Sequence, residues 1–337
     1  MNLLILGGTI FLGRHLVEAA LRHNHQVTLF NRGRHQPDLF PEVEKLRGDR
    51  DGGLEVLRGR QWDAVIDTSG YVPRLVQASA ELLAEAVRHY TFISSISVYA
   101  GFSPEGSDES APLQTLANPA IETVTPETYG GLKARCEEAA EAVMPGRVLN
   151  VRAGLLVGPY DPIPRFAYWL RRVSQGGEVL APGRPDRFIQ LIDARDLAEW
   201  ILKMAEADLI GIYNVTGAPN TLTLGQLLET IRTASSSEAT LTWVEDAFLL
   251  EQGVQPFDGL PFWVPAEMEG VFRVSVERAT AAGLAYRPIA ETVRDTLAWL
   301  AATQPPDRTS PIEITTGLTL EREAALLQAW RQRLIED

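Results

Sequence analysis

The stretch Gly7-Gly8-Thr9-Ile10-Phe11-Leu12-Gly13 decides the fold of this chain. It follows an apolar run at residues 3–6 and precedes a helical pattern at residues 11–23, so a strand, a turn and a helix meet there. The first glycine of the stretch permits a tight turn, and the last lets the helix pack closely on the strand. The N-terminus of the helix would then face a pyrophosphate. The alternative is a glycine turn that caps a strand and binds no ligand.

Further apolar runs and helical patterns alternate along the first half of the chain. The predicted buried strands are residues 3–6, 26–30, 42–46, 64–66, 91–94 and 148–151, and the clearest helices are residues 11–23, 75–89 and 128–143. Alternation of this kind implies right-handed crossovers between parallel strands. We therefore expect an α/β fold of the Rossmann type, with a doubly wound parallel sheet.

The alternation ends near residue 158, where proline and glycine interrupt it. Beyond this point, helices at residues 194–207, 224–234 and 289–301 are mixed with short strands and proline-rich connections. We expect a cofactor-binding domain of residues 1–158 plus roughly 188–217, and a smaller, discontinuous α/β substrate-binding region of residues 159–187 and 218–337. A charged amphipathic helix at residues 318–335 would pack on the body of the protein, and a loop at residues 105–118 could cover a site.

Composition restricts the class of partner. The chain of 337 residues has a net charge of -13 and a pI near 5.0, so a general attraction to nucleic acid or to an anionic membrane is not expected. No apolar run approaches the ~18 residues that a membrane span needs. The single cysteine, Cys136, excludes a disulfide framework and favours a cytoplasmic location. The five histidines show no metal-ligand spacing with carboxylates or cysteine, so no metal site is predicted.

The turn after the second strand indicates which cofactor the chain would bind. About 20 residues after a dinucleotide-binding glycine turn, NAD enzymes carry an acid that binds the ribose. Here the sequence reads Phe30-Asn31-Arg32-Gly33-Arg34, without a carboxylate that would repel a 2′-phosphate. Arg32 could pair with that phosphate or stack on the adenine, so NADP is preferred over NAD. The alternative is that Arg32 and Arg34 are solvated loop residues.

Residues after the later strands complete the predicted cofactor site. Asp49 would accept a hydrogen bond from the adenine amine, and Thr68 and Ser69 would line the cleft at the carboxyl ends of the strands. Ile10 replaces the middle glycine of a GxxGxxG pattern, which departs from ordinary dinucleotide geometry. The predicted cofactor-binding residues are Gly7, Thr9, Ile10, Phe11, Leu12, Gly13, Asn31, Arg32, Asp49, Arg50, Thr68, Ser69 and Lys133.

Tyr129 and Lys133 are four residues apart on one predicted helix, so their side chains share a face. A free tyrosine loses its proton near pH ~10, about 3 units above the value that suits a general base. One cation at ~4 Å in a partly screened site supplies on the order of 4 kcal/mol, which closes that gap. The pair could therefore act as an acid–base group, although many surface helices contain the same spacing by chance.

Taken together, these motifs resemble the short-chain dehydrogenase/reductase superfamily, specifically its extended, epimerase/dehydratase-like branch. The segments that carry the resemblance are residues 7–13, 94–99, 129–133, 152–159, 187–193 and 283–288. The resemblance implies a catalytic site beside a nicotinamide ring. Tyr129 would be the acid–base group, Lys133 would lower its pKa and hold the nicotinamide ribose, and Ser95 would orient the substrate oxygen.

The resemblance also bears on the substrate. It implies that residues 152–157 border the nicotinamide carboxamide, and that Arg184 and Arg187 bind the phosphates of a sugar nucleotide. Surface salt bridges are the alternative for both arginines. Ile96 and Ser97 stand where the sugar-nucleotide dehydratases carry an Asp-Glu pair, so elimination of water is disfavoured.

Three functional classes remain, of which the third is a structural homodimer subunit. The first is an NAD(P)-dependent oxidoreductase or epimerase that acts on a secondary alcohol or ketone of a small molecule, foremost a sugar or nucleotide sugar. The second is an RNA-binding or cofactor-sensing protein without redox turnover, because Ile10 is also a trait of an atypical subgroup that includes chloroplast stem-loop RNA-binding proteins. A homodimer through the helices at residues 75–89 and 128–143 would fit either class, since many relatives pair in this way.

Overall fold

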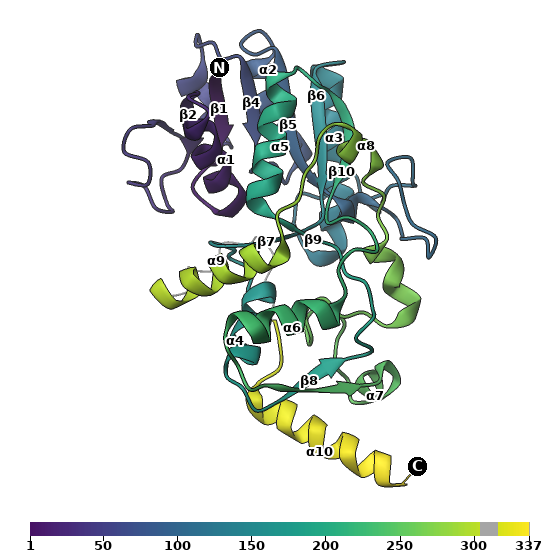
Figure 1. Ribbon diagram of the computed structural model, residues 1–337. Helices are drawn as coiled ribbons and strands as arrows, with labels where there is room; N and C mark the ends of the chain where they lie inside the picture. Colours follow the sequence, from purple (N-terminus) through teal and green to yellow (C-terminus); the bar gives the residue numbers. More distant parts are fainter. Residues whose placement is uncertain (304–315, 337) are drawn as a thin grey trace.

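The computed structural model describes residues 1–303 and 316–336, and seven strands of these residues form one central sheet (Figure 1). The strand order is β10-β6-β5-β4-β1-β2-β3. Every neighbouring pair is parallel, as the alternating sequence pattern predicted. The strands are β1 (Asn2–Leu6), β2 (Gln26–Asn31), β3 (Glu44–Arg47), β4 (Ala64–Asp67), β5 (His89–Ser95), β6 (Val148–Ala153) and β10 (Gly211–Val215).

Helices cover both faces of this sheet. The pair α1 (Phe11–Arg22) and α5 (Ala194–Glu206) packs on one face, where Leu16 and Trp200 belong to the same buried core. The pair α2 (Pro73–Leu83) and α3 (Pro126–Val143) packs on the other face, in a second core. The sheet with these helices forms the upper region in Figure 1, and it confirms the predicted Rossmann-type architecture.

Helix α2 is shorter than the sequence predicted, because it ends at Leu83 and not at residue 89. The backbone beyond it is already paired with the segment that leads into β4. Trp62 N donates to Ala86 O (2.9 Å), and Arg88 N donates to Asp63 O (3.2 Å). These bonds draw the chain out of the helix and into β5, so sheet pairing overrides the helical pattern at residues 84–88.

A separate hydrophobic core organises the lower region in Figure 1, around residues such as Trp169, Leu227 and Trp263. A short parallel pair, β7 with β9, lies between the two regions. The elements of the lower region are α4 (Arg165–Ser174), β8 (Glu178–Pro182), α6 (Leu224–Ala234), β11 (Thr240–Val244), α7 (Asp246–Glu251), α9 (Ile289–Ala302) and α10 (Leu320–Glu336). The remaining elements are β7 (Leu155–Val157), β9 (Leu191–Asp193), α8 (Glu277–Ala281) and the 3-10 helices η1 (Leu54–Leu57), η2 (Ile96–Val98) and η3 (Ala266–Phe272).

The C-terminal helix α10 packs on the body of the protein, as its amphipathic pattern predicted. Trp330 is buried in the lower core, and the centre of its ring lies 5.1 Å from the centre of the Phe248 ring. Glu323 is also buried, and it pairs with Arg172 (2.5 Å) and accepts a hydrogen bond from Leu180 N (2.9 Å). Helix α10 is therefore anchored by both apolar and charged contacts.

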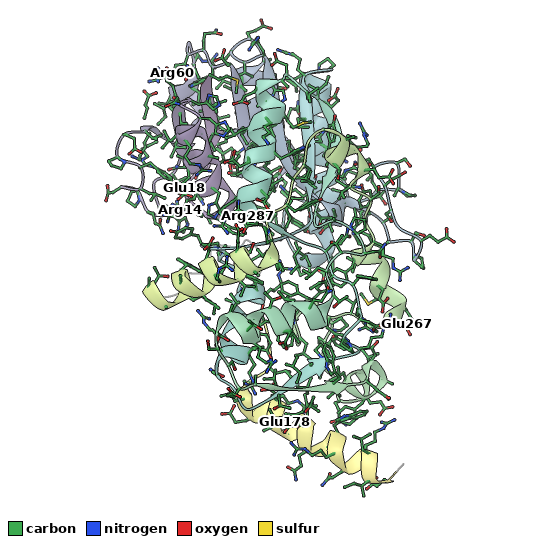
Figure 2. All side chains as sticks on the ribbon, in the orientation of Figure 1. Arg14, Glu18, Arg60, Glu178, Glu267 and Arg287 are labelled. Carbon is green, nitrogen blue, oxygen red and sulfur yellow. The ribbon has the colours of Figure 1, made fainter. Side chains whose placement is uncertain are left out.

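The upper and lower regions are joined by several chain crossings and by side-chain contacts. Helix α8 returns from the second half of the chain to pack against β10 of the sheet. Figure 2 shows Arg14, Glu18 and Arg287 at the level where the regions meet. The guanidinium of Arg14 stacks 3.5 Å from the ring centre of Tyr160, while it also pairs with Glu18. Among the described helices, none is both long and apolar enough to cross a membrane.

Candidate active site

One large cavity, with a volume of about 1190 Å³, opens at the carboxyl ends of the sheet strands. Ligands of doubly wound sheets bind at this edge, beside the point where the strand order reverses. Side chains of the lower region, from α4 and η3 among others, close its far side. All residues predicted to catalyse or to bind the cofactor line it: Gly7, Thr9, Ile10, Phe11, Leu12, Gly13, Asn31, Arg32, Asp49, Arg50, Thr68, Ser69, Ser95, Tyr129 and Lys133. The structure brings these residues together, and their roles stay predictions.

The glycine turn has the backbone that its sequence predicted. Gly7 has φ +110°, a conformation that side-chain-bearing residues rarely adopt. A Cβ on Gly13 would lie 2.9 Å from the backbone of Gly8, so only glycine allows α1 to pack this close to the turn. Ile10, at the replaced position, is the N-cap residue of α1 and makes no side-chain hydrogen bond to the first turn. The N-terminus of α1 is thus left for an anion to cap.

Polar side chains surround the adenosine end of the predicted cofactor site. Asn31 is held in place, since its amide nitrogen donates to Gly7 O (2.8 Å) and its carbonyl oxygen accepts from Gly33 N (2.9 Å). Arg32 is half exposed and lies 4.0 Å from the Asp49 carboxylate. Both side chains are therefore free to reorient toward a ligand, at the small cost of separating an exposed pair.

Arg50 lines the cavity but already has strong partners. Its guanidinium pairs with the buried carboxylate of Asp67 (2.5 Å) and donates to Ser79 Oγ (2.6 Å). Burial penalises the Asp67 carboxylate, but the charge of Arg50 outweighs it and lowers the pKa of Asp67. Arg50 therefore acts first as a structural clamp between the end of β4 and α2.

Tyr129 and Ser95 come together because α3 approaches η2 very closely. A Cβ on Gly130 would overlap Ser97 O, so the glycine after the tyrosine permits this approach. Burial raises the pKa of the Tyr129 phenol, and the neighbouring Tyr71 raises it further. Hydrogen bonding to Ser95 acts in the opposite direction and lowers that pKa. The phenol and the Ser95 hydroxyl therefore lie within hydrogen-bonding reach of each other on the cavity wall.

Lys133 has a different environment from the one that the sequence suggested. Its ammonium group is buried and donates to the carbonyl oxygens of Gly70 and Ile93, both at 2.7 Å. Burial lowers the pKa of Lys133 to about 8. The cation that lowers the pKa of Tyr129 is Arg165, on the first turn of α4. The expected effect of Lys133 on the phenol stays a prediction for the ligand-bound protein.

Neither Arg184 nor Arg187 lines the cavity, in contrast to the expected contact with substrate phosphates. The Arg187 guanidinium is buried and fully engaged, since it pairs with Asp246 (2.5 Å) and Glu269 (2.9 Å) and donates to Val264 O (2.6 Å). Arg184 is exposed and pairs with Asp186 (2.9 Å), two residues further along the chain, and with Glu269 (3.4 Å). The salt-bridge interpretation of both arginines is the one that agrees with this geometry.

Several cavity residues were not found from the sequence. Asp161 and Arg165 lie in the segment where the alternating pattern ends, and Gln114 belongs to the loop at residues 105–118. Burial raises the pKa of Asp161 to about 7, and its carboxylate accepts a hydrogen bond from Ile163 N (2.9 Å). In the sequence, Asp161 and Arg165 stand on either side of two prolines. Such a segment predicts a bend in the chain, but it does not predict the direction in which its side chains point.

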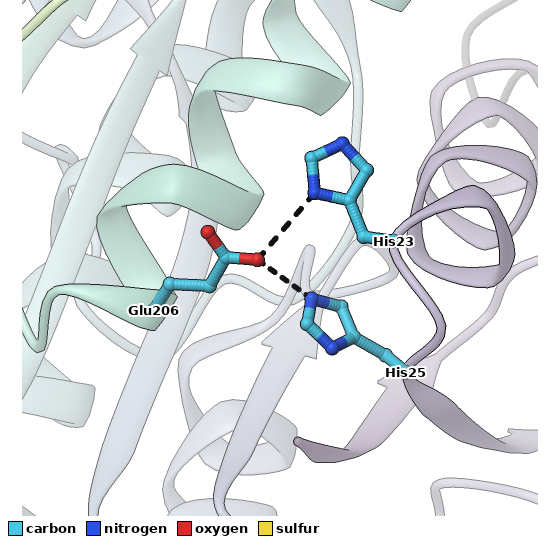
Figure 3. Close-up of side chains that lie close together, drawn as sticks. All are labelled: His23, His25 and Glu206. Atoms are coloured by element: carbon cyan, nitrogen blue, oxygen red, sulfur yellow. Dashed lines mark hydrogen bonds and ion pairs between the residues drawn. The ribbon is translucent and has the colours of Figure 1, made fainter.

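A second cluster of titratable groups lies outside the cavity (Figure 3). His25 Nε2 is 2.8 Å and His23 Nδ1 is 3.5 Å from the Glu206 carboxylate, while His23 Nε2 is 2.9 Å from Glu199. Such a group could hold a metal ion, and sequence spacing missed it because Glu206 is 181 residues from His25. These contacts also account for the cluster as ion pairs that join the turn after α1 to the end of α5.

A family model described as "NAD dependent epimerase/dehydratase family" matches residues 3–216. The chain belongs to this family. The match confirms the resemblance stated from the sequence motifs, and it confirms an enzyme of this NAD-dependent class. It includes the central sheet except for Asn2, the first residue of β1, and ends just beyond β10.

Among curated proteins, the chloroplast stem-loop binding protein of 41 kDa b from Arabidopsis thaliana is 24% identical over 239 residues, or 64% of this chain. The chain spans 58% of the length of that relative. Solved structures of UDP-sugar epimerases have the same fold. UDP-glucuronic acid 4-epimerase from Bacillus cereus, in complex with NAD, has a TM-score of 0.66 at 14% identity, covering 90% of this chain and 99% of that one. UDP-glucose 4-epimerase from Thermus thermophilus, also with NAD, has a TM-score of 0.63 at 19% identity, covering 90% and 100%.

The NAD cofactor of this family fits the residues of the cavity. The volume exceeds the range of roughly 300–1,000 Å³ that is usual for one small ligand, so a dinucleotide and a second molecule have room. The uncapped N-terminus of α1 suits a pyrophosphate. In the described chain, the buried Thr216 Oγ1 on the cavity wall has no hydrogen-bond partner. It occupies the space that a Cβ on Gly154 would need, in the segment expected to border the carboxamide. A bound polar group could supply that partner.

Proposed function

We propose that this protein is an NAD(P)-dependent epimerase that inverts a secondary alcohol carbon of a nucleotide sugar. The observation that carries the proposal is one continuous cavity. It begins at the glycine turn, passes Ser95 and Tyr129, and ends against the lower region. A cofactor on the sheet and a substrate held by the lower region would therefore meet at the phenol of Tyr129.

The residues of the chain suggest how the reaction would be divided among them. The nicotinamide, when bound, would take up a hydride from the substrate carbon and return it. The Tyr129 phenolate would remove the proton of the substrate hydroxyl and later give it back, while Ser95 Oγ would donate a hydrogen bond to the same oxygen. Lys133 is held by two carbonyl oxygens and, with a pKa of about 8, is mostly protonated at pH 7. It would supply a fixed positive charge beside the reaction.

Dehydration remains disfavoured, because the site offers no acid–base pair at positions 96 and 97. Ile96 is buried, and the Ser97 hydroxyl accepts a hydrogen bond from Ser95 (3.1 Å). One tyrosine can exchange one proton, which suits oxidation and reduction of an alcohol. Elimination of water would need a second acid or base.

The function is tested by incubating the protein with NAD(H) or NADP(H) and a panel of UDP-sugars, and following the sugar by proton NMR. We expect C4 epimers to form without net consumption of cofactor. Net reduction of a keto sugar by NADPH would instead identify a reductase. The absence of turnover and of binding for the whole panel would contradict the proposal.

The proposal includes a preference for NADP over NAD, for which Arg32 is the main support. Arg32 lines the cavity, and its ion-pair partner within residues 1–303 and 316–336 is Asp49, at the long distance of 4.0 Å. The Arg32→Ala variant should bind NADPH about tenfold more weakly and NADH nearly unchanged, since one charge-assisted contact to the 2′-phosphate is lost. Equal effects on both cofactors, measured by fluorescence titration, would show that Arg32 contacts a part that they share.

A second candidate function, RNA binding, is favoured by the name of the curated relative, a stem-loop binding protein. Stem-loop RNA that binds tightly at ~50 mM salt and much more weakly at ~200 mM would support it, with no effect of added UDP-sugar. The net charge of -13 argues against such binding. Homodimerisation through α2 and α3 and a cytoplasmic location also stay predictions.

A further inference from the structure

Arg165 is a cation of the cavity wall that has acids nearby but no direct side-chain partner among the described residues. Apart from the exposed Arg32 and Arg34, the lysine and arginine side chains of the described residues that line the cavity are Arg50, Lys133 and Arg165. Arg50 is paired with Asp67, and Lys133 donates to two carbonyl oxygens. Within residues 1–303 and 316–336, the Arg165 side chain forms neither a hydrogen bond nor an ion pair.

The position of Arg165 is fixed by a rigid element. It is the first residue of α4, directly after the N-cap residue Pro164, and the next residue, Phe166, is buried in the lower core. The acids that face it are Asp161 and Asp258, which act on its charge from beyond ion-pair distance, and the Tyr129 phenol lies near enough for the charge to lower its pKa. A guanidinium held this way is a prepared site for a ligand anion, because an unpaired charge in an enclosed site is costly.

The arginines that the sequence favoured for this role are engaged elsewhere. Arg187 is buried and held by Asp246, Glu269 and a carbonyl oxygen. Arg184 does not line the cavity, and it pairs with Asp186 and Glu269. Among the described residues that line the cavity, Arg165 is therefore the lysine or arginine that the lower region contributes.

We propose that Arg165 binds an anionic group of the substrate, a carboxylate or a phosphate, directly beside Tyr129. The inference rests on the proposed function and makes it more specific, because it names the substrate class as an anionic sugar derivative. An arginine fork matches either anion with two parallel hydrogen bonds. The contact would hold the reacting carbon against the phenol and the Ser95 hydroxyl.

Two nucleotide sugars distinguish the two sources of the anion. UDP-glucuronic acid and UDP-glucose share the diphosphate and differ in the carboxylate at C6. Binding of both to the NAD-loaded protein is measured by titration calorimetry for the wild type, Arg165→Gln, Arg165→Lys and the control Arg184→Gln. A loss of tenfold or more for UDP-glucuronic acid alone in Arg165→Gln identifies a carboxylate contact, and an equal loss for both sugars identifies a phosphate contact.

The control measurements distinguish a folding defect, a failure of the inference about Arg165 and a failure of the proposed function. The Arg165 side chain forms no hydrogen bond or ion pair within the described residues, so Arg165→Gln should keep the melting temperature of the wild type. Arg165→Lys should recover part of the affinity. Arg184→Gln should bind both sugars like the wild type. Unchanged affinities in Arg165→Gln, with a wild type that binds these sugars, overturn this inference alone. A wild type that binds neither sugar overturns the proposed function, and this inference with it.

Discussion

At the scale of a single residue, the surroundings of Tyr129 shift the pKa of its phenol in two opposite directions. Burial raises its pKa, while Ser95 and Arg165 lower it, so the free protein keeps the phenol protonated until a ligand changes the balance. Removing the hydroxyl in Tyr129→Phe should lower kcat by about 10²–10⁴-fold, which is typical of losing an acid–base group. Cofactor affinity should stay within about twofold, because the ring remains.

The measurement for this variant is the rate of epimer formation at saturating substrate, together with a cofactor titration. Ser97→Ala is a suitable control, because it removes a neighbouring hydroxyl that contacts Ser95 and not the phenol. Full activity in Tyr129→Phe would remove the tyrosine from the mechanism.

The raised pKa of Asp161 should make the stability of the folded protein depend on pH. Burial raises its pKa from 3.8 to about 7, so the folded protein holds this proton more tightly than the unfolded chain does. The wild type therefore loses stability as the pH rises from about 4 to about 7, and the full cost persists above pH 7. Asp161→Asn escapes this cost, and should be more stable than the wild type at pH 8, by at most about 4 kcal/mol, but equal to it near pH 4.

Urea unfolding at pH 4, 6 and 8 measures this difference. Asp38→Asn is the matched control, because Asp38 is exposed and its replacement should change stability little at any of these pH values. A gain for Asp161→Asn that is the same at all three pH values would show that the carboxyl is not shifted by burial.

At the scale of elements, the glycine turn and α1 form one unit. A Cβ on Gly13 would meet Gly8 Cα and Gly8 N at 2.9 Å, and backbone atoms cannot move aside cheaply. Gly13→Ala should destabilise the protein by about 1–3 kcal/mol and weaken cofactor binding, because α1 is pushed away from the turn. Gly101→Ala is the control, since a Cβ there meets nothing within 4 Å. Denaturant unfolding and a cofactor titration compare the two, and equal stability would contradict the packing argument.

The position of a side chain could be predicted from the sequence where it follows a regular strand, and not where it lies in an irregular turn. The predicted site residues between Gly7 and Lys133 do line one cavity. They could be predicted because the carboxyl ends of parallel strands lie at the same edge of the sheet. Arg165 and Asp161 were missed, because they follow an irregular proline-rich turn where no periodicity gives the side-chain direction. The end of α2 was misplaced, since the hydrogen bonds that stop it come from residues 62–63, which lie outside the local pattern.

At the scale of the whole molecule, the site depends on two regions with separate cores. The upper region supplies the glycine turn, Ser95 and Tyr129, and the lower region supplies Arg165. Because the predicted cofactor-binding residues all lie in the upper region, damage to the lower core should weaken substrate binding more than cofactor binding. Helix α10 offers a way to test this, since it packs only on the lower region within the described chain.

Glu323 is the buried charge that anchors α10. It pairs with Arg172 (2.5 Å) and accepts from Leu180 N (2.9 Å), so Glu323→Gln would leave the Arg172 guanidinium without its counter-charge. Breaking a buried pair from one side costs about 3–5 kcal/mol, and we expect a loss of that size in urea unfolding. The exposed Glu321→Gln, two residues away on the same helix, should change little. Under conditions where Glu323→Gln stays folded, NADP affinity should persist while nucleotide-sugar affinity falls, because Arg165 lies on α4, the helix that Glu323 holds through Arg172. A parallel loss of both affinities would show instead that the two regions fold as one cooperative unit.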